Sequence, residues 1–160
     1  DRLLERLLSK ISEDAATAKV LVFCDTKRET DDVVRHLRTR GWPALSLHGD
    51  KVQEERERVL ADFRSGKVPV LVATDLAARG LDVKDITCVI NFSLPSKIED
   101  YIHRIGRTGR TGHSVHGTSY SFFTPDDFAL AKDLIAVLRA SGQDLNPALI
   151  KFESVQKAPQ

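Results

Sequence analysis

Short apolar runs rich in β-branched residues alternate with longer amphipathic segments along most of this chain. Runs at 19–25, 43–49 and 69–75 stand out, and helical patterns follow the first two of them. Strands that alternate with helices in this way are typical of βαβ units, whose strands lie parallel in one sheet. Because helices cover both faces of such a sheet, its strands are apolar throughout. The sequence therefore predicts an α/β fold with an open, mostly parallel β-sheet flanked by helices on both faces.

The remaining elements follow without a linker or an internal repeat. Further strands are expected at 86–92 and 117–123, and a loop of small residues at 77–80. An opening helix of about three turns is expected to place five apolar residues on one face: Leu3, Leu4, Leu7, Leu8 and Ile11. Four more helices are expected, identified by a cap or by their bounds: after Asp25 or Thr26, at 53–64, from Ser96 to Gly106, and from Pro125 onward. After Gly142 the helical pattern fades, and a tail is expected from about residue 152.

The size and composition exclude several classes of protein. A chain of 160 residues suits a single domain. No apolar run approaches the roughly 20 residues that span a bilayer, and no signal-peptide pattern is present, so we expect a soluble, unexported protein without membrane contact. Cys24 and Cys88 lie far apart in apolar runs, which favours buried free thiols. The chain contains no methionine, so we expect a processed protein or a piece of a longer one.

The net charge of +1 does not indicate a nucleic-acid partner, so a binding site must be sought locally. Parallel sheets bind ligands beyond the carboxyl ends of their strands, where this chain has polar residues at 25–27, 48–50 and 74–75. Gln53 and Arg56 share one face of a helix start, where backbone amides attract phosphate. The glutamates around them also fit an ordinary solvated first turn, and this segment alone favours that simpler interpretation.

The densest unusual stretch is YIHRIGRTGR, at 101–110. Arg104, Arg107 and Arg110 recur every three residues among glycines. Arginine has a rigid charged fork that suits phosphate oxygens, and glycines allow tight turns that bring such forks together. A basic helix end favoured by the helix dipole is the ordinary alternative. Three arginines spaced by glycines favour a phosphate site.

A second candidate segment, ATDLAARGLD at 73–82, directly follows an expected core strand. Thr74 offers a hydroxyl, Arg79 a cation, and Gly80 room for close approach of a ligand. Asp82 offers a carboxylate that could accept hydrogen bonds from ribose hydroxyls. These residues outline a nucleotide-contacting loop, and taken alone they fit an ordinary strand-to-helix connection equally well.

Other kinds of catalytic site are not indicated. His48 and His103 have no Glu or Cys partner at ligand spacing, so no metal site is expected. Gly66 and Lys67 do not fit the phosphate-loop pattern, and no acidic pair is placed to hold Mg²⁺. The sequence thus offers phosphate-binding arginines without a phosphate-binding loop.

Four segments, in this order and spacing, closely resemble the motifs of the second RecA-like domain of DEAD-box RNA helicases. They are VLVFCDTK (20–27), HGDKVQEER (48–56), VLVATDLAARGLDV (70–83) and YIHRIGRTGR (101–110). The resemblance covers nearly the whole chain and implies one RecA-like domain over 1–160. The stretches RGWPALSLHGDK, SYSFFTPDD and LIAVLRASGQDLNP are most similar to the p68-type subgroup.

This resemblance implies roles for individual residues. Arg107 and Arg110 would reach the γ-phosphate of ATP as arginine fingers, and His103 and Arg104 would link the ATP state to a partner domain. Gly80 and Asp82 would bind the nucleotide ribose, with Phe23 packed behind the motif arginines. Six residues would hold the RNA sugar-phosphate backbone: Thr26, Gly49, Gln53, Arg56, Thr74 and Arg79.

The phosphate loop, the adenine-recognition motif and the DEAD sequence are absent from this chain. The resemblance therefore implies that ATP and Mg²⁺ are held mainly by an amino-terminal RecA-like domain of a longer, monomeric protein. That protein would unwind short RNA duplexes inside the cell, in the nucleus or cytoplasm, with the nucleus favoured by the subgroup, and protein cofactors could adjust it. The isolated chain is expected to lack ATPase activity. A RecA-like module that docks a partner, and half of a related DNA helicase, remain as alternatives.

Overall fold

The computed structural model describes residues 2–14, 18–79, 81, 83, 85–108 and 117–156. Five strands form one sheet in the order β2-β3-β1-β4-β5, and every neighbouring pair is parallel. The strands are β1 (Val20–Phe23), β2 (Ala44–Leu47), β3 (Val70–Ala73), β4 (Cys88–Asn91) and β5 (Thr118–Ser121). Each lies inside its predicted range, which confirms the predicted parallel α/β sheet.

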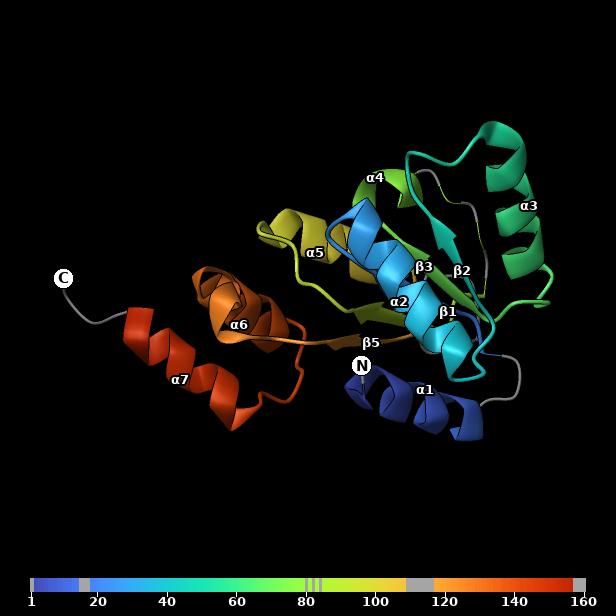
Figure 1. Cartoon of the computed structure of the whole chain (residues 1–160). Helices are drawn as coiled ribbons and strands as arrows, with labels where there is room; N and C mark the ends of the chain where they lie inside the picture. The colour runs from blue at the N-terminus through green and yellow to red at the C-terminus, as the bar shows by residue number, and fades with distance from the viewer. Residues whose placement is uncertain are drawn as a thin grey trace.

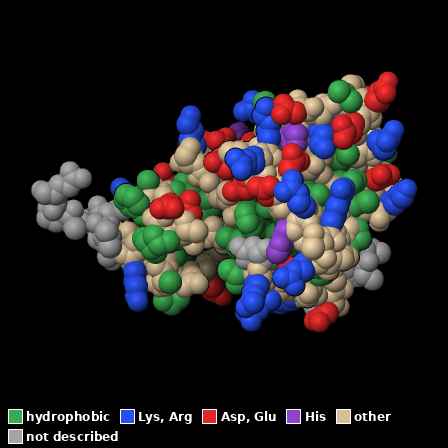
Figure 2. Space-filling view, in the orientation of Figure 1, with side chains coloured by type: hydrophobic (Ala, Val, Ile, Leu, Met, Phe, Trp, Pro, Cys, Tyr) green, Lys and Arg blue, Asp and Glu red, His purple; other side chains and the backbone are tan. Residues whose placement is uncertain are grey.

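Helices alternate with these strands along the chain and surround the sheet (Figure 1). They are α1 (Arg2–Asp14), α2 (Lys27–Thr39), α3 (Gln53–Arg64), α4 (Asp75–Ala78), α5 (Ile98–Ile105), the 3₁₀ helix η1 (Pro125–Leu130), α6 (Ala131–Ala140) and α7 (Pro147–Gln156). In Figure 1, α6 and α7 lie beyond the β5 side of the sheet, away from α3. Basic and acidic side chains intermingle on the face shown in Figure 2, in keeping with the small net charge.

Alternate residues of each strand build two separate cores. Val20 and Val22 of β1 pack with α1 and α2, whereas Leu21 and Phe23 pack with α3 and α4. Burying one such side chain contributes roughly 1.5–3 kcal/mol, so both faces of the strands favour a helical cover. The two-sided burial explains why the strands are apolar throughout.

Two helix starts differ from the prediction. The N-cap of α5 is Lys97, which makes no side-chain cap hydrogen bond, so the predicted cap at Ser96 is wrong. The predicted loop at 77–80 begins within α4, whose N-cap is Thr74. Because Thr74 follows β3 at once, the strand leads directly into a helical turn, and small residues there allow α4 to pack closely.

The end of the chain holds the largest difference. Pro125 starts the 3₁₀ helix η1, which leads into α6 in place of one continuous α-helix. The sequence predicted no helix after Gly142, yet α7 continues to Gln156, past the expected start of the tail, and 157–160 lie outside the described residues. The ring of Phe152 packs 5.0 Å from that of Phe123, measured between centroids, and Leu149 joins the core beside α5 and α6. Tertiary contacts therefore hold a helix whose own periodicity is weak.

Cys24 and Cys88 are buried free cysteines, as the sequence predicted. Burial disfavours the charged thiolate, raising the pKa of Cys88 from 9.0 to about 12 and also raising that of Cys24. Within the described ranges, no helix has the length and apolarity needed to cross a membrane.

Candidate functional site

The strands of the sheet end at a common level. Phe23, the last residue of β1, is paired with Ala73 at the end of β3 and with Asn91 at the end of β4. Leu47 and Ser121 end the two outer strands in the same register. The loops that follow the strands therefore lie side by side along one edge of the sheet, the edge at which such folds bind ligands.

Three of the predicted RNA contacts lie in neighbouring loops of this edge. Thr26 is the exposed N-cap of α2, and its hydroxyl accepts a hydrogen bond from the backbone N–H of Glu29 at 3.1 Å. Gly49 is exposed after β2, and Thr74 is half-buried after β3. Because β3 lies between β1 and β2, Thr74 stands between the loops that carry Thr26 and Gly49.

The other three predicted RNA contacts belong to α3 and to the end of α4. Gln53 is exposed in the first turn of α3, where it donates to a Glu57 carboxylate oxygen at 3.1 Å. Arg56 is half-buried and donates from Nη2 to the carbonyl oxygen of Ala77 at 3.1 Å. This bond joins the start of α3 to α4. Arg79 is the exposed C-cap of α4.

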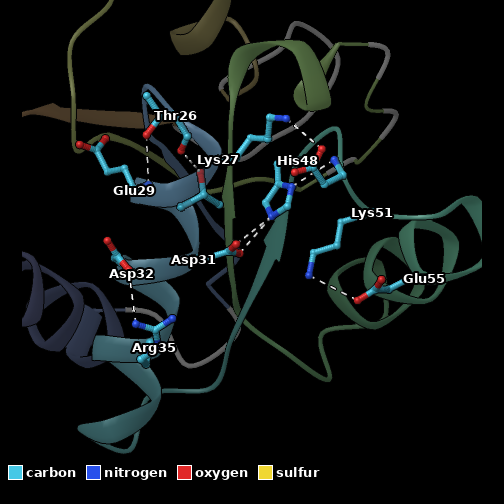
Figure 3. A network of polar contacts seen from close by, with 11 residues as sticks. Thr26, Lys27, Glu29, Asp31, Asp32, Arg35, His48, Lys51 and Glu55 are labelled. Carbon is cyan, nitrogen blue, oxygen red and sulfur yellow. Dashed lines mark hydrogen bonds and ion pairs between the residues drawn. The ribbon is translucent and has the colours of Figure 1, made fainter.

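A buried histidine fixes the loop that follows β2 (Figure 3). The Nε2 atom of His48 lies 3.1 Å from both carboxylate oxygens of Asp31 on α2. Its Nδ1 accepts the backbone N–H of Asp50 at 3.2 Å, so we assign the ring proton to Nε2, which donates to Asp31. The side chain of Asp50 accepts from Lys27 Nζ at 2.9 Å. This hydrogen bond and the lysine charge lower the pKa of Asp50 from its ordinary 3.8.

A second polar cluster lies further along the edge, around Arg104 of α5, whose side chain is only 1% exposed. Its Nε and Nη2 donate to the two carboxylate oxygens of Asp75, at 2.6 and 2.7 Å. Nη1 donates to the side-chain oxygen of Asn91 at 3.1 Å and to the carbonyl oxygen of Ser93 at 2.6 Å. The guanidinium carbon lies 5.0 Å from the centre of the Phe23 ring, so Phe23 packs behind this arginine as predicted.

This geometry corrects one part of the sequence prediction. The three arginines of the 101–110 segment were expected to present their forks to phosphate, but that of Arg104 is buried and bonded to four acceptor atoms of the protein. The expectation is therefore wrong for Arg104. The role suggested for it by resemblance, a link to a partner domain, stays a prediction.

Arg107 differs from Arg104 by lying half-buried at the C-terminal end of α5. Its Nη1 donates to the carbonyl oxygen of Leu81 at 3.4 Å, which brings it beside the segment predicted to contact ribose. His103 is exposed on α5. Gly80, Asp82 and Arg110 lie outside the described residues, so their predicted roles stay predictions.

Sequence reasoning noted Asp75 as a polar residue at the end of a strand, and it missed the other residues that organise these clusters. Asp75, Asn91 and Ser93 surround Arg104, and Glu29 joins the loop after β1 to that after β4 by accepting hydrogen bonds from the Asp25 N–H and the Ser93 hydroxyl. One signal was available: Asn91 is a polar residue in an otherwise apolar strand. A buried amide needs a partner, so it predicts a polar neighbour.

The described residues contain no group of three or more His, Cys, Asp or Glu side chains that could hold a metal ion. The arrangement offers hydroxyls, a glycine and arginines along the sheet edge, with the half-buried Arg107 just past the end of α5. These groups suit the binding of phosphate and sugar oxygens.

Comparison with known proteins agrees with this geometry. Residues 2–112 match the family described as the helicase conserved C-terminal domain. DEAD-box ATP-dependent RNA helicase 30 of Arabidopsis thaliana is 53% identical over 144 residues, which cover 90% of this chain and 24% of that protein. The chain belongs to the DEAD-box RNA helicases. Probable ATP-dependent RNA helicase DDX17 of Homo sapiens is 48% identical over 152 residues, 95% of this chain and 20% of that protein.

Solved structures of DEAD-box proteins share the fold. The yeast DEAD-box splicing factor Prp28 gives a TM-score of 0.80 at 32% identity, over 96% of this chain and 35% of that one. Saccharomyces cerevisiae Dbp5 L327V bound to RNA and ADP BeF3 gives 0.71 at 30% identity, over 95% and 40%. The predicted DEAD-box family, p68-type resemblance and RecA-like fold are thereby confirmed. The chain is a C-terminal RecA-like domain and spans about a quarter of the length of the curated relatives it matches.

Proposed function

We propose that this chain works as the second RecA-like half of an ATP-dependent RNA helicase. The observation that carries the proposal is the sheet edge, where Thr26, Gly49 and Thr74 lie in adjacent loops with Arg56 and Arg79 close by. Its relatives are named ATP-dependent RNA helicases, and a structural neighbour is bound to RNA and ADP BeF3.

On the RNA side, the chain contributes contacts to one strand. The hydroxyls of Thr26 and Thr74 bond phosphate or sugar oxygens, the loop at Gly49 allows the strand to approach, and Gln53, Arg56 and Arg79 extend the contact along α3 and α4. Because these contacts are to the backbone, binding is insensitive to base sequence and sensitive to salt.

On the nucleotide side, Arg107 and Arg110 act as arginine fingers, and Gly80 and Asp82 bind the ribose. The Arg107 side chain already contacts Leu81, which stands between Gly80 and Asp82 in the sequence, so these groups belong to neighbouring segments. ATP and Mg²⁺ are held mainly by an amino-terminal RecA-like domain of the same protein. Closure of the two domains over ATP and RNA bends one strand and separates a short duplex, and hydrolysis reopens the cleft.

The chain alone should not hydrolyse ATP. Purified chain mixed with ATP, Mg²⁺ and single-stranded RNA should release no phosphate above the rate of the buffer, because half of the nucleotide site is supplied by the other domain. ATP hydrolysis by this chain would contradict the proposal.

In the two-domain protein, Arg107→Ala should abolish turnover, since an arginine finger is typically worth about 10³–10⁵ in rate. The variant should remain folded because Arg107 is half-buried and, among the described residues, its side chain makes one long hydrogen bond, to Leu81. ATPase assays with circular dichroism as the folding control test this. Retained ATPase activity would remove the finger assignment.

Two other outcomes identify the rival functions. Direct competition between RNA and DNA of one sequence for the two-domain protein should favour RNA, and equal binding would indicate a DNA helicase. Partner capture that survives an Arg110 substitution, without RNA-stimulated ATPase activity in the parent protein, would indicate a docking module.

We also propose that the parent is a monomer located in the nucleus or cytoplasm, which chromatography and imaging of the tagged protein would test.

A further inference from the structure

An exposed ion pair bridges two of the loops proposed to hold RNA. Lys27 Nζ lies 2.9 Å from a carboxylate oxygen of Asp50, and the two side chains are 57% and 67% exposed. Lys27 follows Thr26 in the loop after β1, and Asp50 follows Gly49 in the loop after β2. Because β3 lies between these two strands, the pair joins the loops on either side of the strand that leads to Thr74.

Gly49, beside this pair, is not required by the fold. Its φ is not in the left-handed region, and a Cβ placed on it would meet no atom within 4 Å. Gly41, in contrast, has a φ of +87°, which only glycine adopts readily. Neither backbone geometry nor packing therefore explains Gly49. A glycine in open space at a binding edge suits the close approach of a ligand backbone.

The backbone of Asp50 is fixed while its side chain is exposed. Its N–H is bonded to Nδ1 of His48, which is itself held by Asp31. The carboxylate can therefore leave Lys27 by rotation of the Asp50 side chain alone. The oxygen that it places on the ammonium is equivalent in charge and hydrogen bonding to a phosphate oxygen. Exposed ion pairs contribute little to stability, so exchanging one anion for another has a small cost.

We propose that Lys27 is a further contact to an RNA phosphate, and that Asp50 occupies its ammonium until RNA displaces the carboxylate. This inference rests on the proposed function, because it assumes that RNA lies along the β1–β3–β2 edge. Asp50 then acts as a competitor within the site and lowers the affinity for RNA. Substitutions of Lys27 and Asp50 should therefore change the affinity for RNA in opposite directions.

The test uses the chain itself and a fluorescent single-stranded oligouridine, with Kd measured by anisotropy across a range of salt concentrations. Lys27→Gln should weaken binding several-fold at low salt and reduce the slope of log K against log salt by about 0.7, the contribution of one phosphate contact in a single strand. Asp50→Asn should tighten binding. In the double variant the gain from Asp50→Asn should largely vanish, because the lysine it frees is absent.

A matched control is available on α2. Asp32 pairs with Arg35 at 3.4 Å, and both side chains are exposed. Asp32→Asn changes the net charge as Asp50→Asn does. Because Asp32 lies more than one turn along α2 from Lys27, its substitution should alter Kd much less. Circular dichroism checks that all variants fold.

The outcomes separate the two proposals. Equal affinities for Asp50→Asn and Asp32→Asn, or an unchanged Kd and salt slope for Lys27→Gln, would overturn the competitor assignment. Weaker binding by Arg56→Gln in the same assay would still support the proposed RNA edge. If neither the wild-type chain nor Asp50→Asn binds the oligouridine even at the lowest salt concentration, both the proposed function and the competitor assignment are overturned.

Discussion

Two cations at the same edge of the sheet, Arg104 and Lys27, have opposite surroundings. Arg104 is buried, donates to four acceptor atoms of three residues and lies over an aromatic ring. Lys27 is exposed and donates to one carboxylate from a neighbouring loop. The difference teaches that the number of fixed partners, more than the charge, separates a cation that holds the fold from one that can exchange its partner for a ligand.

The largest expected effect concerns the thiol of Cys88, a residue as deeply buried as Arg104. Burial raises the pKa of Cys88 from 9.0 to about 12, so at pH 8 the reactive thiolate should be about a thousandfold scarcer than in an ordinary thiol. Iodoacetamide followed by mass spectrometry should show slow labelling of native Cys88 and fast labelling in urea. Cys24, whose pKa is also raised, should behave alike. Native labelling at the rate of a free peptide would show that this core opens readily.

Arg104→Met should be the next largest effect. It leaves Asp75, Asn91 and Ser93 without their common donor and should lower the free energy of unfolding by about 3 kcal/mol. Urea unfolding measures the change. Arg139→Met is the control, since its ion pair with Glu153 involves a half-exposed arginine and should matter by less than about 1 kcal/mol. Equal losses for the two variants would break the distinction between buried and exposed arginines.

Thr26 belongs to both sides of the comparison, because it caps α2 and is also a proposed RNA contact. Thr26→Ala should lower the free energy of unfolding by about 1 kcal/mol through loss of the cap bond to the Glu29 N–H. Thr26→Asn keeps a capping oxygen and should restore stability. If Thr26→Asn binds RNA as the wild type does, the hydroxyl is not an RNA contact.

The smallest effect is expected for Lys27. Asp50 has a lowered pKa because Lys27 donates a hydrogen bond to it and attracts its charge. The pair is therefore present above the ordinary carboxyl pKa and is lost as pH falls through the lowered value. Carboxyl-carbon NMR should show the Asp50 midpoint moving up toward 3.8 in Lys27→Gln, with no measurable change in the urea midpoint. A clear loss of stability would place Lys27 with Arg104 among the structural cations.

The sheet could be predicted from the sequence because its information is local. Each strand is a short apolar run, and alternate residues of β1 serve two different cores, so burial on both faces is written into the run itself. The N-cap of α2 could be predicted for the same reason, since Thr26 bonds a residue three positions away. The weak α7 could not, because it is held by tertiary contacts that its own periodicity does not show: the Phe152 ring packs on Phe123, and Leu149 joins the core beside α5 and α6.

The candidate site was predicted in part. The strand-end residues follow from topology, which places the loops after β1, β2 and β3 together. The surroundings of Arg104 do not, because the spacing within 101–110 shows three similar arginines and does not reveal that Asp75, Asn91 and Ser93 bind one of them. The bridge from Lys27 to Asp50 was missed for a similar reason, as it joins residues 23 positions apart.

The common level of the strand ends gives this surface a built-in scale. Neighbouring strands lie about 4.8 Å apart, a distance that backbone hydrogen bonds set and side chains do not alter. The loops therefore stand at fixed intervals along the edge. Substitutions within one loop change the side chains that it presents but leave its distance from the neighbouring loops unchanged. If a single strand slipped by one residue, the loop that follows it would move by about 3.3 Å along the strand direction, and the other loops would keep their positions. Such a slip, more than any loop substitution, would spoil the fit of a periodic polymer.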